Sequence, residues 1–466
     1  MNKKALLLIS CTLSCTLFGC TLGPDYKRPD AVSDKQIDAA LSVTPNNDAG
    51  IDADWHKAFG DEQLNELIQM ALADSPTVKS AVEKLRQARL NLEIQGVQYY
   101  PTVDLAGEYT KLKPSKNTSS AFKESYYQAG LDVAWELDIW GAGRRATENA
   151  RALAEAAAAG LDNVRITLKA EVINNYISLR LAQEQLRLLN RTLSLQRKIV
   201  MLAADKADSG LISQSDLRHI QYSEETIKSQ IPDLKTALGA YKNNLTLLTG
   251  KLPEQLNTLL EESSENIIRD SFRYDLSALY LIPAQTVRNR PDVRQAEQNL
   301  IAQNALIGKA TAELFPNVSF SGLFGFQADH LPKLPNHKSR TFTLTPGITL
   351  PLIHWGALLN QVKMEKSATR QAALAYQNAV LNAVAEIKNA MISVSEQVAK
   401  NQTTRNALEK MRDISALTLA QYDSGLISLS ETLSIFQNLL TAQTNLAQGN
   451  GAVYQAVVSF YKALGY

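Results

Sequence analysis

The six residues DSGLIS occupy positions 208–213, and the same six recur unchanged at positions 423–428. Trp140 and Trp355, each followed by glycine, are separated by the same offset of 215 residues. Agreement at a single offset across distant parts of a chain indicates two copies of one structural unit. We therefore expect an internally duplicated fold rather than two unrelated domains.

The repeat organises the 466 residues into five segments. Two segments are the copies themselves, and two others lie before and between the copies, where the pattern is broken. The expected segments are a signal peptide at residues 1–19, an N-terminal segment at 20–62, the first copy at 63–250, an insertion at 251–284 and the second copy at 285–466.

Each copy shows the same succession of patterns: a helix, a β-hairpin, a long helix, a turn and a return helix. The opening helix of the first copy is expected to run from residue 63 to residue 98, and Pro101 ends it because proline lacks the backbone N–H. A long helix of about 65 residues would extend about 100 Å. The hairpins are expected at residues 101–139 and 316–354, the long helices at 141–207 and 356–422, and the turns at 208–213 and 423–428.

An apolar seam supports the first long helix, because five aliphatic residues follow one another at intervals of seven, the spacing of a coiled coil. In the second copy Asn401 interrupts the corresponding seam. Gly210 and Gly425 are expected to take the left-handed conformation that often ends a helix. The seam residues are Val172, Leu179, Leu186, Leu193 and Val200.

The predicted strands alternate apolar and polar residues with the period of two that a strand requires. In the first hairpin, Val103 and Leu105 alternate with Asp104 and Ala106. A soluble sheet could carry the same pattern with its apolar face on a core. We favour a lipid-facing sheet with a polar lumen face, because aromatic residues lie along or at the ends of the strands and the N-terminus has the features of an export signal.

The N-terminus is typical of a secretion signal, with Lys3 and Lys4 followed by an apolar stretch and a small residue. The sequence LFGC at residues 17–20 resembles a bacterial lipobox and predicts a covalent lipid on Cys20. An ordinary secretion signal with an incidental cysteine is the alternative. Cys20 would be the only cysteine of the mature chain, which excludes a disulfide framework.

Composition excludes several function classes. A net charge of +1 argues against a nucleic-acid partner. The five histidines show no metal-ligand spacing, and the chain has neither a nucleophile elbow nor a phosphate-binding loop. We therefore expect no catalytic centre, no metal and no cofactor apart from the lipid on Cys20.

Four amphipathic strands are too few to close a barrel, because the smallest single-chain barrels have about eight. Open strand edges in lipid would leave backbone groups unpaired, at several kcal/mol each. Identical chains must therefore share the sheet. Two copies would give eight strands and three would give twelve. We favour three, because the long helices suggest a wide tube.

The sequence CTLGPDYKRP at residues 20–29, the paired helix–Pro–strand units and the doubled SGLIS turns resemble the TolC-like outer-membrane efflux proteins. The resemblance points to their lipoprotein branch, which works with resistance–nodulation–division pumps. It implies a homotrimer with a twelve-stranded barrel in the outer membrane, a periplasmic α-helical tunnel and an equatorial collar made by the non-repeated segments. The tunnel would dock onto a periplasmic adaptor protein and an inner-membrane pump.

The resemblance also implies a function, the passive exit of drugs or other small toxic molecules from the pump assembly to the outside. Two alternatives remain open at the level of sequence. One is an exit duct for protein secretion. The other is a periplasmic coiled-coil scaffold anchored only by lipid, which would leave the two alternating hairpins unexplained.

In this family the helix tips close the tunnel, and the resemblance places candidate gate residues here. Asp216 and Glu431 occupy matching acidic positions after the turns, and Tyr422 resembles the tyrosine that ties neighbouring helices together. A position often charged in relatives is Ile427 here, matched by Ile212, so we expect an apolar constriction. The alternative for Asp216 and Glu431 is a helix-start role. The tip residues expected to meet the adaptor are Ser209, Gly210, Leu211, Ser424, Gly425 and Leu426.

Overall fold

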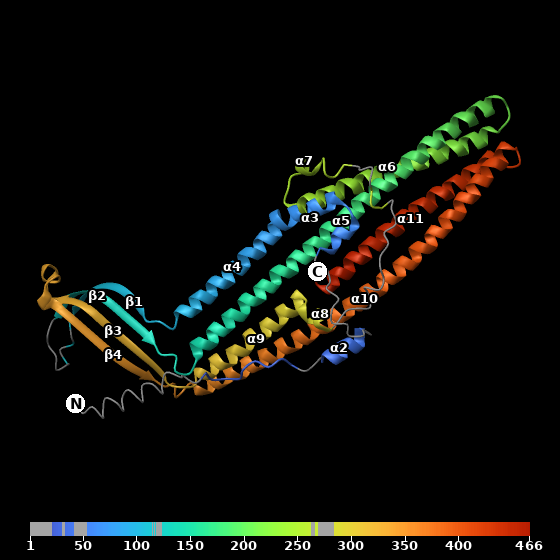
Figure 1. Cartoon of the computed structure of the whole chain (residues 1–466). Coiled ribbons are helices and arrows are strands. Elements are labelled where there is room, and N and C mark those ends of the chain that lie inside the picture. The colour runs from blue at the N-terminus through green and yellow to red at the C-terminus, as the bar shows by residue number, and fades with distance from the viewer. Residues whose placement is uncertain are drawn as a thin grey trace. The chain divides into compact units, whose positions relative to one another are not determined.

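The computed structural model describes residues 21–29, 33–41, 54–113, 115, 117, 124–261, 266–268 and 284–466. The predicted signal peptide, Cys20 and part of the predicted insertion lie outside these residues. The described chain is mainly helical and contains a four-stranded antiparallel sheet (Figure 1). The predicted fold class, mainly α with four strands in a duplicated chain, is confirmed.

The two copies contain matching elements in the same order. The N-terminal segment contributes α2 (Asp34–Leu41) and the short helix η1 (Trp55–Phe59). The first copy comprises α3 (Glu62–Asp74), α4 (Pro76–Val97), β1 (Thr102–Leu112), β2 (Glu124–Glu136), α5 (Ala142–Asp208) and α6 (Gln214–Thr249), followed by α7 (Pro253–Leu256). The second comprises α8 (Ala284–Asn289), α9 (Pro291–Ala312), β3 (Asn317–Ala328), β4 (Arg340–Thr349), α10 (Trp355–Asp423) and α11 (Leu429–Leu464), with short turns η3 (Leu331–Lys333) and η4 (His337–Ser339).

The opening helix of the first copy is not continuous, so the expectation of one helix from residue 63 to 98 is wrong. α3 ends at Asp74, Ser75 is extended with ψ 127°, and Pro76 begins α4. The second copy breaks at the equivalent place, where Pro291 begins α9. Proline disfavours helical geometry in the residue before it and is well suited to the first position of a new helix.

The described chain divides into two compact units, and neither unit corresponds to one sequence copy. Unit 1 contains the described residues of Met1–Asp30 together with Lys84–Ala158 and Gln295–Gln377, and therefore holds the whole sheet. Unit 2 contains the described residues of Ala31–Glu83, Ala159–Arg294 and Asn378–Tyr466. Each unit combines matching parts of both copies, so the copies fold together.

The register of the sheet, ordered β1-β2-β3-β4, aligns apolar residues of all four strands on one face. Leu131 lies opposite Leu105 on β1 and Phe324 on β3, and Phe324 lies opposite Phe342 on β4. Within the described chain these apolar side chains are largely uncovered: Leu105 is 84% exposed and Phe342 is 73% exposed. The predicted apolar face therefore exists as a continuous surface.

The opposite face of the sheet is polar. Asp104 lies directly opposite Asp132. A second cross-strand row on this face runs from Ala134 on β2 through Ser321 on β3 to Thr345 on β4. Leu323 is an apolar exception on this face. The two faces alternate along each strand because successive side chains point to opposite sides of a sheet.

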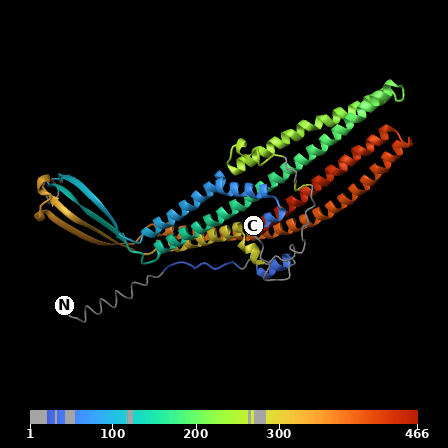
Figure 2. The same cartoon turned by 45° about the horizontal axis from the view of Figure 1, so that its top comes forward.

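In unit 2 the long helices pair into two antiparallel hairpins, α5 with α6 and α10 with α11, whose turns lie at the same end (Figures 1 and 2). Of the predicted seam, Val172, Leu179 and Leu193 are buried, whereas Leu186 and Val200 are half-buried. The polar seam residue Asn401 donates a 2.9 Å hydrogen bond to Asn450 on α11. The interruption in the seam is thus paired with a polar partner.

Part of the predicted insertion packs on α5 within unit 2. The guanidinium of the fully buried Arg180 donates a 2.8 Å hydrogen bond to the Glu261 carbonyl, and Asn266 donates one of 2.9 Å to the Arg180 carbonyl. Arg180 also lies over the Tyr176 ring at 4.8 Å. These contacts hold Glu261 and Asn266, two described residues of the insertion, against α5.

Among the described residues, none of the helices combines the length and the apolar character needed to cross a lipid bilayer.

Candidate functional site

The two helix turns that carry the duplicated motif have the same backbone conformation. Gly210 has φ +71° and Gly425 has φ +73°, in the left-handed region where a side chain would be strained. Leu211 N–H donates to the Lys206 carbonyl at 2.8 Å, and Leu426 N–H donates to Gln421 at 2.9 Å. These bonds from the residue after the glycine satisfy carbonyls in the last helical turn. The predicted left-handed caps are confirmed.

Ser213 and Ser428 begin the two return helices as N-caps. The Ser213 hydroxyl accepts from Asp216 N–H at 3.0 Å, and the Asp216 carboxylate accepts from Ser213 backbone N–H at 3.3 Å, which completes a capping box. Ser428 accepts from Glu431 N–H at 3.1 Å. The Asp216 carboxylate is therefore engaged at the start of its helix, as the alternative interpretation expected, whereas Glu431 makes only the backbone half of this arrangement.

Tyr422 joins the two hairpins near their tips. Its hydroxyl accepts a 2.9 Å hydrogen bond from Lys206 Nζ on α5, and Nζ also lies 5.2 Å from the centre of the Tyr422 ring. The pair combines a charge-assisted hydrogen bond with a cation–π contact. Both residues belong to unit 2, and together they tie the end of one long helix to the end of the other.

The two isoleucines of the motif have different surroundings. Ile212 packs against an apolar cluster that includes Leu217 and Leu433, so it belongs to the core of the tips. Ile427 is half-buried and is not among the residues that pack on this cluster. Ile427 is thus the better candidate for an apolar constriction, and its role stays a prediction.

The predicted docking residues are presented at the turns. Leu211 is 73% exposed and Leu426 is 75% exposed. Ser209 and Ser424 each donate to the carbonyl four residues earlier, at 2.9 Å, so both hydroxyls are engaged within their own helices. A Cβ at either turn glycine would have no atom within 4 Å in the described chain. The tips therefore offer two small, matching surfaces with an exposed leucine on each.

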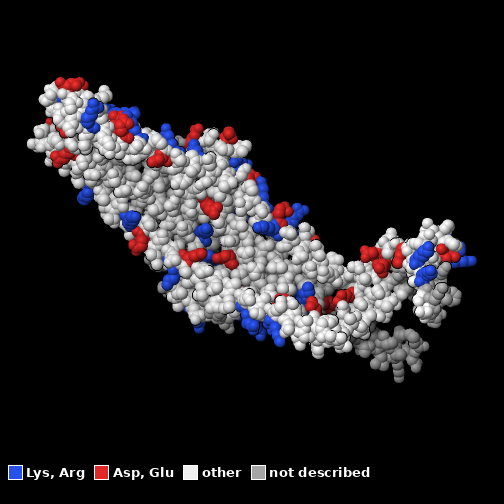
Figure 3. Space-filling view, turned by 180° about the vertical axis from the view of Figure 1, so that it is seen from behind, with Lys and Arg blue, Asp and Glu red and all other residues white. Residues whose placement is uncertain are grey.

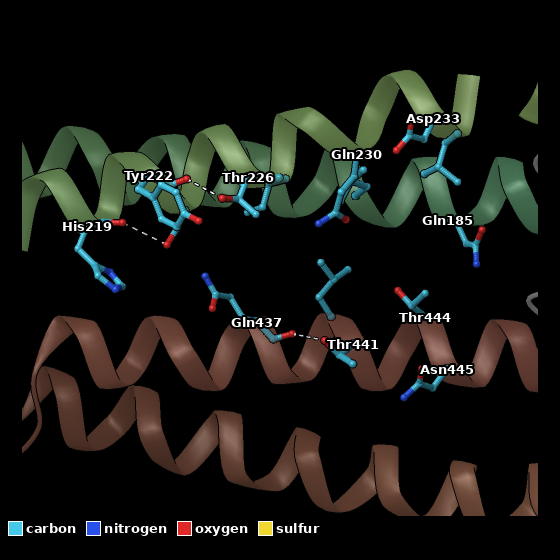
Figure 4. A pocket seen from close by; sticks show the side chains of 15 residues that line it. Gln185, His219, Tyr222, Thr226, Gln230, Asp233, Gln437, Thr441, Thr444 and Asn445 are labelled. Carbon is cyan, nitrogen blue, oxygen red and sulfur yellow. Dashed lines mark hydrogen bonds between the residues drawn. The ribbon is translucent and has the colours of Figure 1, made fainter. Parts of the chain in front are cut away.

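A groove with a mixed polar and apolar lining lies farther along unit 2, between the helical hairpin of α5 and α6 and helix α11 (Figure 4). It has a volume of about 700 Å³, and amides and hydroxyls supply most of its polar lining. Thr226 and Thr441 hydroxyls donate to carbonyls of their own helices. His219 and Asp233, which also line it, are fourteen residues apart on α6, or about 21 Å, too far to act on one proton. The groove suits passage or packing rather than catalysis.

Charges of both signs are mixed on one face of the described chain (Figure 3). On the face displayed in Figure 3, lysines and arginines are interspersed with aspartates and glutamates over the described residues. The polar face of the sheet carries acidic residues on the first hairpin, including the directly opposed Asp104 and Asp132. Such a face suits water and cations better than a nucleic acid.

Lys206 was not foreseen from the sequence. A signal did exist: the tips match closely between the copies, but at the matching offset Lys206 corresponds to Gln421 and Tyr422 corresponds to Ala207. Lys206 and Tyr422, whose contact is named the tie here, thus stand at positions where the two copies differ. Their pairing requires the two hairpins to lie side by side, which spacing in the chain does not reveal.

The chain is similar to known proteins over almost its whole length. The family model for outer membrane efflux proteins matches residues 67–251 and 282–466, more than half of the chain. Nodulation protein T from Rhizobium leguminosarum bv. trifolii is 26% identical over 93% of this chain and 92% of its own length. The probable efflux pump outer membrane protein TtgC from Pseudomonas putida is 26% identical over 99% and 95%.

A solved structure of the outer-membrane channel OprN matches with a TM-score of 0.85 and 27% identity, covering 96% of this chain and 99% of that one. Fold, tips and comparisons together define an outer-membrane channel of the efflux type. The chain belongs to the outer membrane efflux protein family. Its two matched blocks are offset by the same 215 residues as the two DSGLIS motifs.

Proposed function

We propose that three copies of this chain form the outer-membrane exit duct of a tripartite efflux system. The observation that carries the proposal is the two-faced sheet, with an exposed apolar face and a polar face. Exposed apolar patches of this extent mark contact with lipid or with a partner. Lipid would contact the apolar face, and a water-filled lumen would contact the polar face.

The sheet also supports joint closure by several chains. β1 and β4 are its edges, and each pairs on one side only within the described chain. An unpaired edge inside a bilayer costs several kcal/mol per backbone group. A cyclic assembly removes every such edge, and three chains supply twelve strands around a water-filled interior.

The helical hairpins are proposed to form the periplasmic tunnel, with their tips toward a periplasmic adaptor and a pump of the resistance–nodulation–division type. The exposed leucines Leu211 and Leu426 would provide apolar contacts for the adaptor. The tie between Lys206 and Tyr422 would hold the tips in a narrow arrangement. Three copies of Glu431 around the axis would favour the entry of cations.

The proposed cargo is a drug or another small toxic molecule, in line with a relative from Pseudomonas putida that is named an antibiotic efflux pump outer membrane protein. The proposal requires no chemical step in this chain, because the pump supplies the energy and the duct supplies a path. We therefore propose that the chain is not an enzyme. A covalent lipid on Cys20 completes the proposal and would retain the N-terminus at the outer membrane.

The test is reconstitution of the purified full-length chain into planar bilayers, with its mass measured in mild detergent. The expected results are a trimer and discrete ion-conducting events. A monomer, or bilayers that never conduct, would refute the duct. Replacement of Cys20 by serine distinguishes the duct from a scaffold that is anchored only by lipid. The scaffold would leave the membrane fraction, whereas the duct would stay there. Copurification from cells should recover an adaptor and a pump, whereas secretion partners would favour the protein-export alternative.

A further inference from the structure

The motif GPDYKRP at residues 23–29 has no part in the duct or its tips, yet it is tightly held within unit 1. Leu22 N–H donates to the Trp140 carbonyl at 3.1 Å, directly before α5. The buried Arg145 on α5 donates to the carbonyls of Leu22 and Gly23 at 3.1 and 3.3 Å and forms a 2.8 Å ion pair with Asp25. Residues 21–29, named the strap here, are therefore fixed at the first turn of α5.

The strap then follows α9, which belongs to the second sequence copy. Asn304, which is buried, donates to the Pro24 carbonyl at 2.9 Å. Glu297 accepts from the Tyr26 hydroxyl at 3.0 Å and from the Arg28 guanidinium at 2.7 and 3.1 Å. Burial, together with the nearby Glu297 carboxylate, raises the pKa of Tyr26, so this hydroxyl keeps the proton that it donates.

Backbone contact defines the register of the strap. A Cβ at Gly308 on α9 would lie 2.6 Å from the Leu22 oxygen, and one at Gly23 would lie 2.3 Å from the Gly308 Cα. Gly23 also has φ +91°, which favours glycine. At these two positions the strap and the helix touch backbone to backbone, so neither glycine can carry a side chain without displacing the strap.

The lengths agree with a fully extended strap. From Gly308 to Glu297 the helix advances eleven residues, or about 16 Å. From Gly23 to Arg28 the strap advances five residues, which span about 16 Å when extended. The two spans are similar in length, so the strap can run alongside α9 between these contacts.

The fixed end of the strap lies beside the end of the sheet. A Cβ at Gly141 would lie 2.9 Å from the Cα of Thr21, and Gly141 follows β2 by five residues. Trp140 beside it donates to the Pro316 carbonyl at 2.8 Å, directly before β3. Thr21 therefore sits at the junction of strands and helices in both copies, and the residue before it in the chain is Cys20.

We propose that the strap is an anchor-positioning device, which holds the lipid-bearing end of the chain at this junction so that lipid and sheet enter the membrane at one level. The proposal rests on the proposed function for the lipid and for the membrane location of the sheet. The peptide contacts, rather than the lipid itself, supply the positioning.

The first measurement tests whether the strap is held. Trypsin can cut between Lys27 and Arg28 only when the strap leaves α9. In the full-length protein, Gly308→Ala should speed this cleavage at least tenfold. Gly96→Ala is the matched control, because a Cβ at that helical glycine of unit 1 would meet no atom within 4 Å. Glu297→Ala should also speed cleavage without any steric clash. Equal rates in all four proteins would overturn the strap.

The second measurement tests positioning. A four-residue Gly-Ser linker between Cys20 and Thr21 should leave trypsin resistance unchanged but reduce the fraction of protein that resists alkaline carbonate extraction by half or more. Incorporation of labelled palmitate verifies that the lipid is still attached. Insertion equal to the original protein would overturn the positioning role. Failure of the proposed duct is a separate result, because it would appear as absent conductance in the unaltered protein.

Discussion

Lys206 Nζ donates a 2.9 Å hydrogen bond to the Tyr422 hydroxyl and lies 5.2 Å from the centre of the same ring. The two residues come from different sequence copies, at positions where the copies do not match. An exact duplicate of the first tip would lack the tyrosine. The tie therefore depends on the divergence of the copies after duplication.

Loss of this tie should open the tips. Lys206→Met removes both the hydrogen bond and the cation, whereas Tyr422→Phe keeps the ring and removes only the hydroxyl. A hydrogen bond to a charged group at a partly exposed site contributes about 1 kcal/mol, so each tie lost should shift the balance toward open tips about fivefold. Single-channel recording should show larger or longer openings, with a stronger effect for Lys206→Met.

Tyr241→Phe is the control for this experiment, because that tyrosine also lies on α6 but outside the tips and the groove. It should conduct as the unaltered protein does. The double variant of Lys206 and Tyr422 should match Lys206→Met alone, since the two residues act through one contact. Additive effects, or unchanged conductance in both single variants, would contradict the tie as a gate element.

The two isoleucines of the motif should respond differently to the same change. Ile212→Ser removes apolar contacts from the tip cluster and should destabilise the tips by about 1–2 kcal/mol. Ile427→Ser should cost less than about 0.5 kcal/mol but should increase conductance if this residue lines an apolar constriction. Thermal unfolding and single-channel recording distinguish these effects. The constriction is misplaced if Ile427→Ser leaves conductance unchanged.

Neighbouring residues of β1 test which face of the sheet meets lipid. Leu105→Arg places a charge on the exposed apolar face and should oppose membrane insertion by about 2–4 kcal/mol. Ala106→Arg adds the same charge to the polar face and should insert normally. The membrane fraction of each variant gives the answer. Equal insertion of both would mean that the apolar face does not contact lipid.

The helical hairpin of α5 and α6 should lose stability in acid, because Glu224 on α6 loses its charge. A 2.7 Å bond from Lys228 lowers the pKa of this carboxyl from its ordinary value of 4.5, and Arg197 on α5 adds a weaker contact. The stabilisation is complete above about pH 4.5, where the carboxyl is ionised folded or unfolded, and is lost as the pH falls through the lowered pKa of the folded chain.

Glu224→Gln should therefore reduce the free energy of unfolding at pH 7 by a few tenths to about 1 kcal/mol, because the pair is partly exposed. The difference between the two proteins should disappear in acid below the lowered pKa. Unfolding curves at pH 7 and in acid check this. A difference that persists in acid would indicate lost packing rather than a lost ion pair. Glu225→Gln removes an equally short ion pair with Lys228, but its side chain is 70% exposed, so it should have the smaller effect.

Local patterns predicted much of the fold. Period-two alternation predicted both strand faces, and the register confirmed a row from Leu105 to Phe342. The turn glycines Gly210 and Gly425 were predicted from the motif because only a left-handed residue ends the helix in this way. These features depend on neighbours within a few residues, which the sequence displays directly.

The contact between Lys206 and Tyr422 and the helix break before Pro76 were not predicted. The break before Pro76 was missed, although proline is present in the sequence, because the amphipathic pattern continues across it. At the tips, Asp216 was proposed for the gate; it forms a capping box with Ser213 at the start of α6, and its role in the gate stays a prediction.

The sequence by itself determined the duplication, the helix and strand patterns, the two faces of the sheet and the turn at each helix tip, because each is written in short-range periodicity or exact repetition. Only the tertiary structure decided that both units combine the two copies, that Lys206 meets Tyr422, and that the strap lies on Gly308 of α9. The reason is physical: these features depend on segments that are far apart in the chain and are brought together by packing. The packing energy that selects one partner segment over another does not appear in the local sequence pattern of each segment.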